Sequence, residues 1–207
     1  ESLAGIIAGR LRERYHKPSF VLTRGEEGVK GSGRSIESYS MYEKLCECKE
    51  YLTKFGGHPM AAGLSLEEEN VERFRRKLNE QSGLTEEDLV EKVTIDVPMP
   101  IHYIRKDLVQ ELSLLEPFGK GNEKPLFAQK NLWVSQMRVF GKNRNVVKMR
   151  LTDENGYPMD GVYFGNGDEF AEEGRGKRKI SIVYYPDINM YQGRESLQVI
   201  IRHYQFD

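Results

Sequence analysis

The sequence has little of what builds disulfide frameworks, zinc sites or membrane spans. Two of its 207 residues are cysteines, Cys46 and Cys48, and they lie two positions apart on a segment with helical periodicity. Their side chains therefore face different directions. This spacing excludes a disulfide framework and a zinc site, and we expect a reducing cytosol as the setting. No apolar run approaches the length of a membrane-spanning helix, so we expect no membrane partner.

Neither sign of charge is in excess. The chain has 31 Lys and Arg residues against 32 Asp and Glu residues, for a net charge of −1. Any contact with nucleic acid must therefore come from a local patch of cations and not from a global field. The composition, with 38% hydrophobic and 30% charged residues, is that of a globular chain. Its length suffices for one large domain or two small ones.

The first half of the chain alternates between helical and strand periodicity. The expected elements are a helix over 2–15, strands over 19–23 and 29–35, and a helix from about 40 to 55. Ser65, with Glu68 three residues later, has the pattern of a capping box and predicts a further helix. This alternation is typical of an α/β layer.

The second half changes from a period of 3.6 to a period of 2. Apolar residues from Ile101 to Leu115 predict one more helix, which Pro117 ends, and the turn-rich loop 116–122 follows. Beyond it, short alternating strands separated by glycine-containing turns are typical of a small barrel. We therefore predict an α+β chain with three parts. These are an α/β domain with a mixed sheet over 1–96, a linker helix and loop over 97–123, and a β-barrel of OB-fold size over 124–207.

One octapeptide, Gly56-Gly57-His58-Pro59-Met60-Ala61-Ala62-Gly63, is almost free of large side chains. We predict that Gly56, Gly57 and His58 form a turn with open backbone N–H groups and a projecting imidazole, which suits a phosphate or a nucleotide edge. The small residues after it allow a strand to lie close to its neighbours. A glycine pair by itself is equally consistent with an ordinary helix C-cap.

The strand over 29–35 carries a second candidate phosphate site. Strand alternation places Lys30, Ser32 and Arg34 on one face, with two glycines on the other. An ammonium, a hydroxyl and a guanidinium in a row can cradle a phosphate, and Arg34 can bind one with two parallel hydrogen bonds. The alternative is a solvated edge strand.

The octapeptide resembles the GGHxxAAG signature of the DHH-associated domain, which is the second domain of the DHH phosphoesterase superfamily. Other motifs resemble one branch of that superfamily, the RecJ family of single-strand-specific 5′→3′ exonucleases. These motifs are ESLAGIIAGRL at 1–11, YHKP at 15–18, GSGRS at 31–35, EPFGKGN at 116–122 and NMYQGRESLQ at 189–198. The last two are specific to RecJ, although Tyr191 stands where a Trp is usual. Together the motifs cover nearly the whole chain.

The resemblance implies a DHH-associated domain followed by an OB-fold, in an enzyme of DNA repair and recombination. It implies that Ser32 and Arg34 hold the 5′ end and a backbone phosphate of single-stranded DNA. Hydrolysis by metal-activated water, with Mn²⁺ or Mg²⁺, would belong to an N-terminal DHH domain whose Asp-His-His triplet this sequence lacks. We therefore expect a C-terminal fragment with no catalytic residue and no metal ligand, inactive alone. Its candidate partners are single-stranded DNA, the DHH domain, and a single-strand-binding protein or a helicase.

The predicted barrel offers aromatic and cationic side chains for single-strand binding. Stacking on an aromatic ring contributes ~1–3 kcal/mol per base and tolerates any sequence. The candidates are Trp133, Lys148, Arg150, Tyr191 and Arg194. The alternative is that the barrel buries its aromatic residues and that its outward cations are only solvated.

Two other functions fit part of the sequence. A DHH-type phosphoesterase of short oligonucleotides or cyclic dinucleotides explains the octapeptide and Arg34, but not the loop 116–122 or the trailing β domain. A non-enzymatic single-strand-binding module explains the lack of metal ligands, but not the octapeptide. Dependence of binding on a 5′ phosphate distinguishes the exonuclease from this module.

Overall fold

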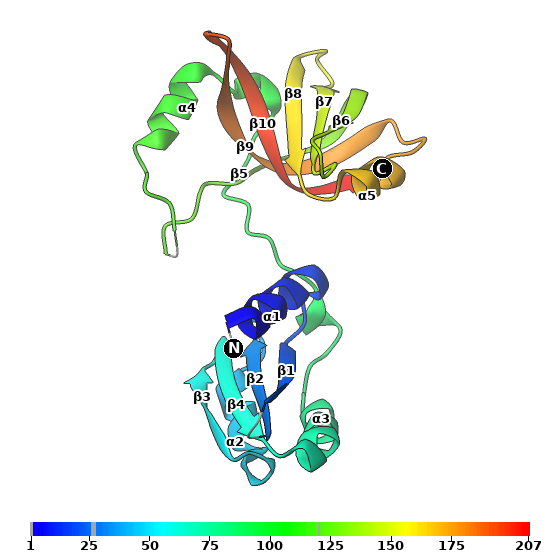
Figure 1. Cartoon of the computed structure of the whole chain (residues 1–207). Coiled ribbons are helices and arrows are strands. Elements are labelled where there is room, and N and C mark those ends of the chain that lie inside the picture. Colours follow the sequence, from blue (N-terminus) through cyan, green and yellow to red (C-terminus); the bar gives the residue numbers. More distant parts are fainter. Residues whose placement is uncertain (1, 26–27, 120) are drawn as a thin grey trace. The chain divides into compact units, whose positions relative to one another are not determined.

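The chain folds into two compact units that divide between Lys92 and Val93 (Figure 1). The computed structural model describes residues 2–25, 28–119 and 121–207. Each unit has its own sheet and its own hydrophobic core. Within the described ranges, no helix combines the length and the apolar character needed to cross a membrane. The predicted α+β class is confirmed.

The first unit is built on a sheet with the strand order β1-β2-β4-β3. All three of its strand pairings are antiparallel, so the predicted mixed sheet is wrong for this unit, because its strands are joined as two hairpins. Its strands are β1 (Ser19–Gly25), β2 (Gly28–Arg34), β3 (Lys54–His58) and β4 (Ala61–Leu66). The helices are α1 (Ser2–Tyr15), α2 (Met41–Cys46) and α3 (Val71–Glu80), with 3-10 turns η1 (Lys49–Tyr51), η2 (Glu68–Asn70) and η3 (Glu87–Leu89). The predicted helix over 2–15 and the predicted hairpin of β1 and β2 are therefore confirmed.

The two faces of this sheet are covered differently. Alternate residues such as Val29 and Leu64 are buried in a core that α2 and α3 complete, with Phe74 of α3 packing edge-on against Phe20. The opposite face is flanked by α1, which contacts β1 and β2. Only part of that second face is covered, so the remainder stays open to solvent.

Helix α1 packs through its smallest side chains. Ala8 is fully buried, whereas the large apolar side chains of Leu3, Ile6 and Ile7 are 70%, 55% and 47% exposed. Small residues on the packed side let the helix backbone approach the sheet closely. The helical spacing of the large apolar residues thus predicts the helix correctly, although these residues form its outer face and not its packed face.

Two predicted elements differ from the structure. The helix expected over about 40–55 ends at Cys46, because the backbone N–H of Thr53 donates to Ser65 and the chain then pairs with β4 as β3. Ser65 is a strand residue, and α3 begins at Val71 after a 3-10 turn. The predicted capping box is therefore wrong.

The second unit is a barrel of OB topology. Its strands are β5 (Val97–Pro98), β6 (Phe127–Phe140), β7 (Val146–Thr152), β8 (Pro158–Phe164), β9 (Lys179–Tyr191) and β10 (Arg194–Phe206). Its helices are η4 (Ile101–Tyr103), α4 (Lys106–Ser113) and α5 (Gly167–Glu173). The order β6-β7-β8-β10-β9 returns to β6 through the β6–β9 pairing, and β8 and β10 are parallel. The predicted OB-type barrel is confirmed.

The segment predicted as a linker, 97–123, differs from the structure because its first part belongs to the second unit. β5 pairs with β6, and Ile101 and Ile104 are buried in the barrel core. His102 Nδ1 lies 2.7 Å from Oδ2 of the buried Asp153. These contacts hold the segment to the barrel, and the division lies at 92/93 instead of 96/97.

Candidate nucleic-acid interface

The register of the first sheet sets three rows of residues on the face that α1 flanks. Directly paired residues of antiparallel strands point to the same face. From β1 to β3, the rows are Thr23-Lys30-Ser65-Lys54, Val21-Ser32-Gly63-Gly56 and Ser19-Arg34-Ala61-His58. The two outer rows carry cationic side chains and an imidazole, whereas the middle row is small across β2, β4 and β3.

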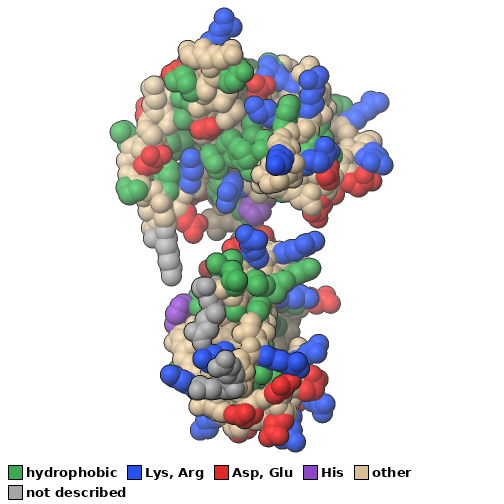
Figure 2. All heavy atoms as spheres, in the orientation of Figure 1, with side chains coloured by type: hydrophobic (Ala, Val, Ile, Leu, Met, Phe, Trp, Pro, Cys, Tyr) green, Lys and Arg blue, Asp and Glu red, His purple; other side chains and the backbone are tan. Residues whose placement is uncertain are grey.

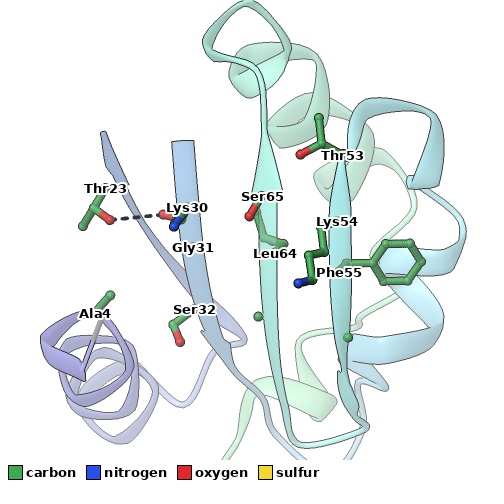
Figure 3. A pocket seen from close by; sticks show the side chains of 12 residues that line it. Ala4, Thr23, Lys30, Gly31, Ser32, Thr53, Lys54, Phe55, Leu64 and Ser65 are labelled. Carbon is green, nitrogen blue, oxygen red and sulfur yellow. Dashed lines mark hydrogen bonds between the residues drawn. The ribbon is translucent and has the colours of Figure 1, made fainter. Parts of the chain in front are cut away.

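This face is hollowed, because its middle has almost no side chains. A cavity of about 660 Å³ lies over the sheet, and its lining includes Thr23, Lys30, Ser32, Lys54 and Ser65 (Figure 3). Gly56 and Gly63 lie exposed on its floor. A ligand can therefore approach the sheet backbone closely while cations stand at its sides.

Arg34 is held in place at one end of the face. Its Nη1 donates a hydrogen bond to the carbonyl oxygen of Gly33 at 2.8 Å. The guanidinium also lies against α1, where a Cβ at Gly5 would be only 2.8 Å from Nη2. Glycine at position 5 thus leaves the space that this guanidinium occupies. A pre-positioned guanidinium loses less freedom when it binds a phosphate.

The Gly-Gly-His motif forms a strand and not the turn that we predict from the sequence. Gly56, Gly57 and His58 belong to β3, and Pro59 and Met60 lie at the tip of the β3–β4 hairpin. Because β3 is the outer strand of the sheet, half of its backbone groups point away from β4.

Local geometry fixes the residue types of this motif. Gly57 has φ +151°, and a Cβ there would collide with the carbonyl oxygen of Ala61. The backbone N–H of Met60 donates to Nδ1 of His58 at 3.3 Å. In the neutral imidazole this leaves Nε2 as the ring nitrogen that carries the proton. His58 can then offer a donor at its outer end.

Lys54, Thr53 and Ser65 line the cavity but are absent from the sequence-based candidates. The reason is the overlong helix predicted over 40–55, which hides the strand register of Lys54. The hydrophobic–polar alternation of Phe55 and Lys54 before two glycines is the signal that favours a strand.

A second groove lies on the barrel, beside strand β7 and the tip of the β9–β10 hairpin. Lys148, Asn189, Tyr191 and Arg194 line a cavity of about 620 Å³ there. The Tyr191 ring is 67% exposed and is available for stacking. In OB-folds this face, together with the loop between the fourth and fifth strands, is the usual site for oligonucleotides. The structure thus brings three of the five barrel candidates together.

The other two barrel candidates are engaged elsewhere. Arg150 forms an ion pair with Asp160 in a smaller neighbouring cavity of about 270 Å³. Trp133 lines neither of these two cavities, and Nζ of Lys179 lies 4.7 Å from its ring centroid. Figure 2 shows that basic and acidic side chains are interspersed over both units on the visible face. The cations that line the two cavities are Lys30 and Lys54 in the first unit and Lys148 and Arg194 in the barrel, whereas Arg34 and His58 lie on the sheet face outside the cavity lining.

The described residues offer no donor set for a catalytic metal. No group of three or more His, Cys, Asp or Glu side chains among them is arranged to hold an ion. His102 and Asp153 form an isolated pair. Burial would raise the pKa of the Asp153 carboxyl, but hydrogen bonds from the Tyr157 N–H, His102 and the Asn155 N–H hold it below its usual value. We assign no hydrolytic step to these residues.

Fold and site together define a two-domain chain, in which an α/β domain with an open sheet face flanked by cationic side chains precedes an OB-type barrel. A family model described as the RecJ OB domain matches residues 95–203, and one described as the DHHA1 domain matches residues 2–83. The chain belongs to the RecJ family.

Relatives in sequence and structure agree with this assignment. Single-stranded-DNA-specific exonuclease RecJ of Bacillus subtilis (strain 168) is 38% identical over 97% of this chain and 26% of its own length. RecJ of Salmonella typhimurium is 34% identical over 97% of this chain and 36% of its own length. The crystal structure of RecJ with Mg²⁺ from Thermus thermophilus superposes with a TM-score of 0.78 at 25% identity, covering 97% of this chain and 30% of that one. The chain thus spans about a quarter to a third of these relatives.

Proposed function

We propose that this chain is the strand-binding, C-terminal portion of a RecJ-type single-stranded-DNA exonuclease. The observation that carries the proposal is the open sheet face of the first unit, with Arg34 and His58 at one end and a floor of small residues. Cations around a floor without side chains suit a phosphate backbone, which must approach closely and be recognised without regard to base.

The barrel groove has the complementary chemistry. Tyr191 offers an exposed ring for stacking, and Lys148 and Arg194 supply cations beside it. Stacking and cations together bind a single strand without sequence preference. We assign the sheet face to the 5′-terminal and adjoining phosphates, and the barrel groove to the strand beyond them.

The rest of the proposal follows from the family. Hydrolysis in the 5′→3′ direction, with Mg²⁺ or Mn²⁺, belongs to a DHH domain outside this chain. This chain by itself is therefore inactive. Crystal structures of RecJ from Thermus thermophilus are complexes with one or the other of these two metals. The whole enzyme acts in the cytoplasm in DNA repair and recombination, with a single-strand-binding protein or a helicase as partner.

The test is the fluorescence anisotropy of labelled, 5′-phosphorylated single-stranded DNA, compared with duplex of the same length over a salt series. We expect a preference for the single strand and an affinity that falls as salt rises. Arg34→Ala should weaken binding, whereas Arg73→Ala should not, because Arg73 is an exposed residue of α3, on the covered side of the sheet.

Four results would count against the proposal. Equal binding of duplex and single strand removes the single-strand assignment. If Arg34→Ala and Arg73→Ala change the affinity for single-stranded DNA equally, the sheet face is not the binding surface. Metal-dependent degradation of DNA by the purified chain contradicts the assignment of hydrolysis to another domain. Preferential binding of a cyclic dinucleotide over single-stranded DNA would favour the phosphoesterase of small nucleotides.

A further inference from the structure

The end of the sheet face opposite Arg34 and His58 has a cationic row of its own. Lys30 and Lys54 lie in this row with Ser65 between them. Four residues separate this row from the Arg34 row along both β2 and β3, which at 3.3–3.4 Å per residue is about 13 Å. Two strand spacings separate β2 from β3, or about 10 Å. The face is therefore a four-cornered platform, with Arg34 and Lys54 at opposite corners.

The residues at the Lys54 corner line the cavity over the sheet. The backbone N–H of Thr53 donates to the carbonyl oxygen of Ser65 at 2.9 Å, which fixes the start of β3 against β4. Lys54 and Ser65 both line the cavity, as does Thr53 (Figure 3). Across the sheet, the hydroxyl of Thr23 donates to the carbonyl oxygen of Lys30 at 3.3 Å. No acidic residue is among the described residues that line this cavity.

A phosphate bound to Arg34 cannot also bind at this corner. The guanidinium is tied to the Gly33 carbonyl and lies against Gly5, so it stays at its own end of the face. A hydrogen bond from Lys54 needs its acceptor within about 3.2 Å of Nζ. The distance across the platform therefore separates two anion positions that one phosphate group cannot share.

We propose that Lys54, with Ser65 next to it and Lys30 two strands away in the same row, forms a second phosphate-binding position for a nucleic-acid strand, downstream of the phosphate at Arg34. This inference rests on the proposed function, because it takes the ligand to be a single strand that enters with its 5′ phosphate at Arg34. A nucleic-acid strand that runs from Arg34 on β2 to Lys54 on β3 then crosses the floor at Gly63 of β4 and Gly56 of β3, where the sheet carries no side chain. Only a strand above a minimum length can occupy both phosphate positions at once. A mononucleotide can occupy one of them only.

The experiment is a length series with the purified chain. Binding of thymidine 5′-monophosphate and of 5′-phosphorylated thymidine dinucleotide, trinucleotide and tetranucleotide is measured by calorimetry for the wild type and three variants. The variants are Arg34→Ala, Lys54→Ala and the control Lys49→Ala. Lys49 is an exposed lysine of η1, whose neighbour Tyr51 packs into the core on the covered face of the sheet.

Arg34→Ala should weaken every ligand of the series. Lys54→Ala should leave the mononucleotide unchanged and weaken the tetranucleotide about three- to tenfold, the range expected for one exposed charge-assisted contact. It should also reduce the slope of log affinity against log salt by about 0.7 for the tetranucleotide, because one phosphate contact is lost. Lys49→Ala should bind every ligand as the wild type does.

The outcomes separate the two proposals. If Arg34→Ala weakens binding while Lys54→Ala matches Lys49→Ala at every length, the second position is overturned and the strand-binding function stands. If Lys54→Ala weakens binding of the mononucleotide as much as binding of the tetranucleotide, Lys54 acts only through long-range charge attraction. The second position is then likewise overturned. If the wild type binds neither this series nor longer single-stranded DNA, the proposed function fails together with the inference.

Discussion

Substitution by alanine at Gly5 and at Gly9, two glycines of α1, should affect DNA binding differently. A Cβ at Gly5 would lie 2.8 Å from Nη2 of Arg34 and 3.4 Å from Oγ of Ser32, whereas a Cβ at Gly9 would meet no atom within 4 Å. Both Gly→Ala changes raise helix propensity by about 1 kcal/mol. Only the change at Gly5 also disturbs the guanidinium that we assign to phosphate binding.

The size of the disturbance follows from the geometry. Ordinary van der Waals contact begins at 3.4 Å, so Nη2 must retreat by at least 0.6 Å from a methyl group at position 5 (3.4 minus 2.8). A hydrogen bond to a charged group contributes about 1.5–3 kcal/mol when well aligned. A displaced guanidinium should forfeit about 1 kcal/mol of this, which weakens binding about fivefold.

The assays are thermal unfolding and anisotropy with 5′-phosphorylated single-stranded DNA. Gly9→Ala should raise the unfolding temperature of the first unit by about 4–8 °C and leave affinity unchanged. Gly5→Ala should bind more weakly while remaining folded, since the neighbour that gives way is the far end of a flexible side chain. If Gly5→Ala binds as tightly as Gly9→Ala, the placement of Arg34 by α1 plays no part in binding.

Three further predictions concern thiols, pH and the barrel groove. Burial and, next, the nearby Glu50 carboxylate raise the pKa of the Cys48 thiol to about 11. Cys48 should therefore resist alkylation at neutral pH until the protein unfolds, while Cys46 reacts. Equal alkylation rates of the two thiols in the native protein would contradict this. The Asp153 carboxyl has a lowered pKa, so its stabilising contribution should be complete above about pH 4 and be lost as the pH falls further, and Asp153→Asn should remove that part of the pH dependence of unfolding. In the barrel, Tyr191→Ala should weaken single-strand binding by ~1–3 kcal/mol, as anisotropy would detect, with no loss of stability because the ring is exposed.

The sequence predicts those parts of the fold that have a clean period. Val147, Met149 and Leu151 alternate with Lys148, and the structure buries the first three. The barrel strands follow from such runs, and the closing β6–β9 pairing follows from the OB resemblance. The helix over 2–15 is equally regular, but its period could not say which side packs. Small residues decide that, because the sheet accepts a helix at close approach through Ala8 and Gly5.

The candidate site is predictable where it lies on one strand and less so where strands must pair. Ser32 and Arg34 share a face by strand alternation alone. Lys54 joins them only through the β3–β4 register, which depends on the hairpin at Pro59 and Met60. Local propensity favours a helix before that hairpin, and tertiary pairing overrides it. The pairing of Arg150 with Asp160 similarly depends on β8, which the spacing of charges does not reveal.

The most direct test of the central claim maps the interface on the chain itself. Backbone amide shifts of the nitrogen-15-labelled chain are followed during titration with 5′-phosphorylated single-stranded DNA. We predict that the largest changes occur over 30–34 and 54–58 in the first unit and over 189–196 at the tip of the barrel hairpin. Changes concentrated on α3 and α5, or no changes at these three segments while the DNA binds, would contradict the account.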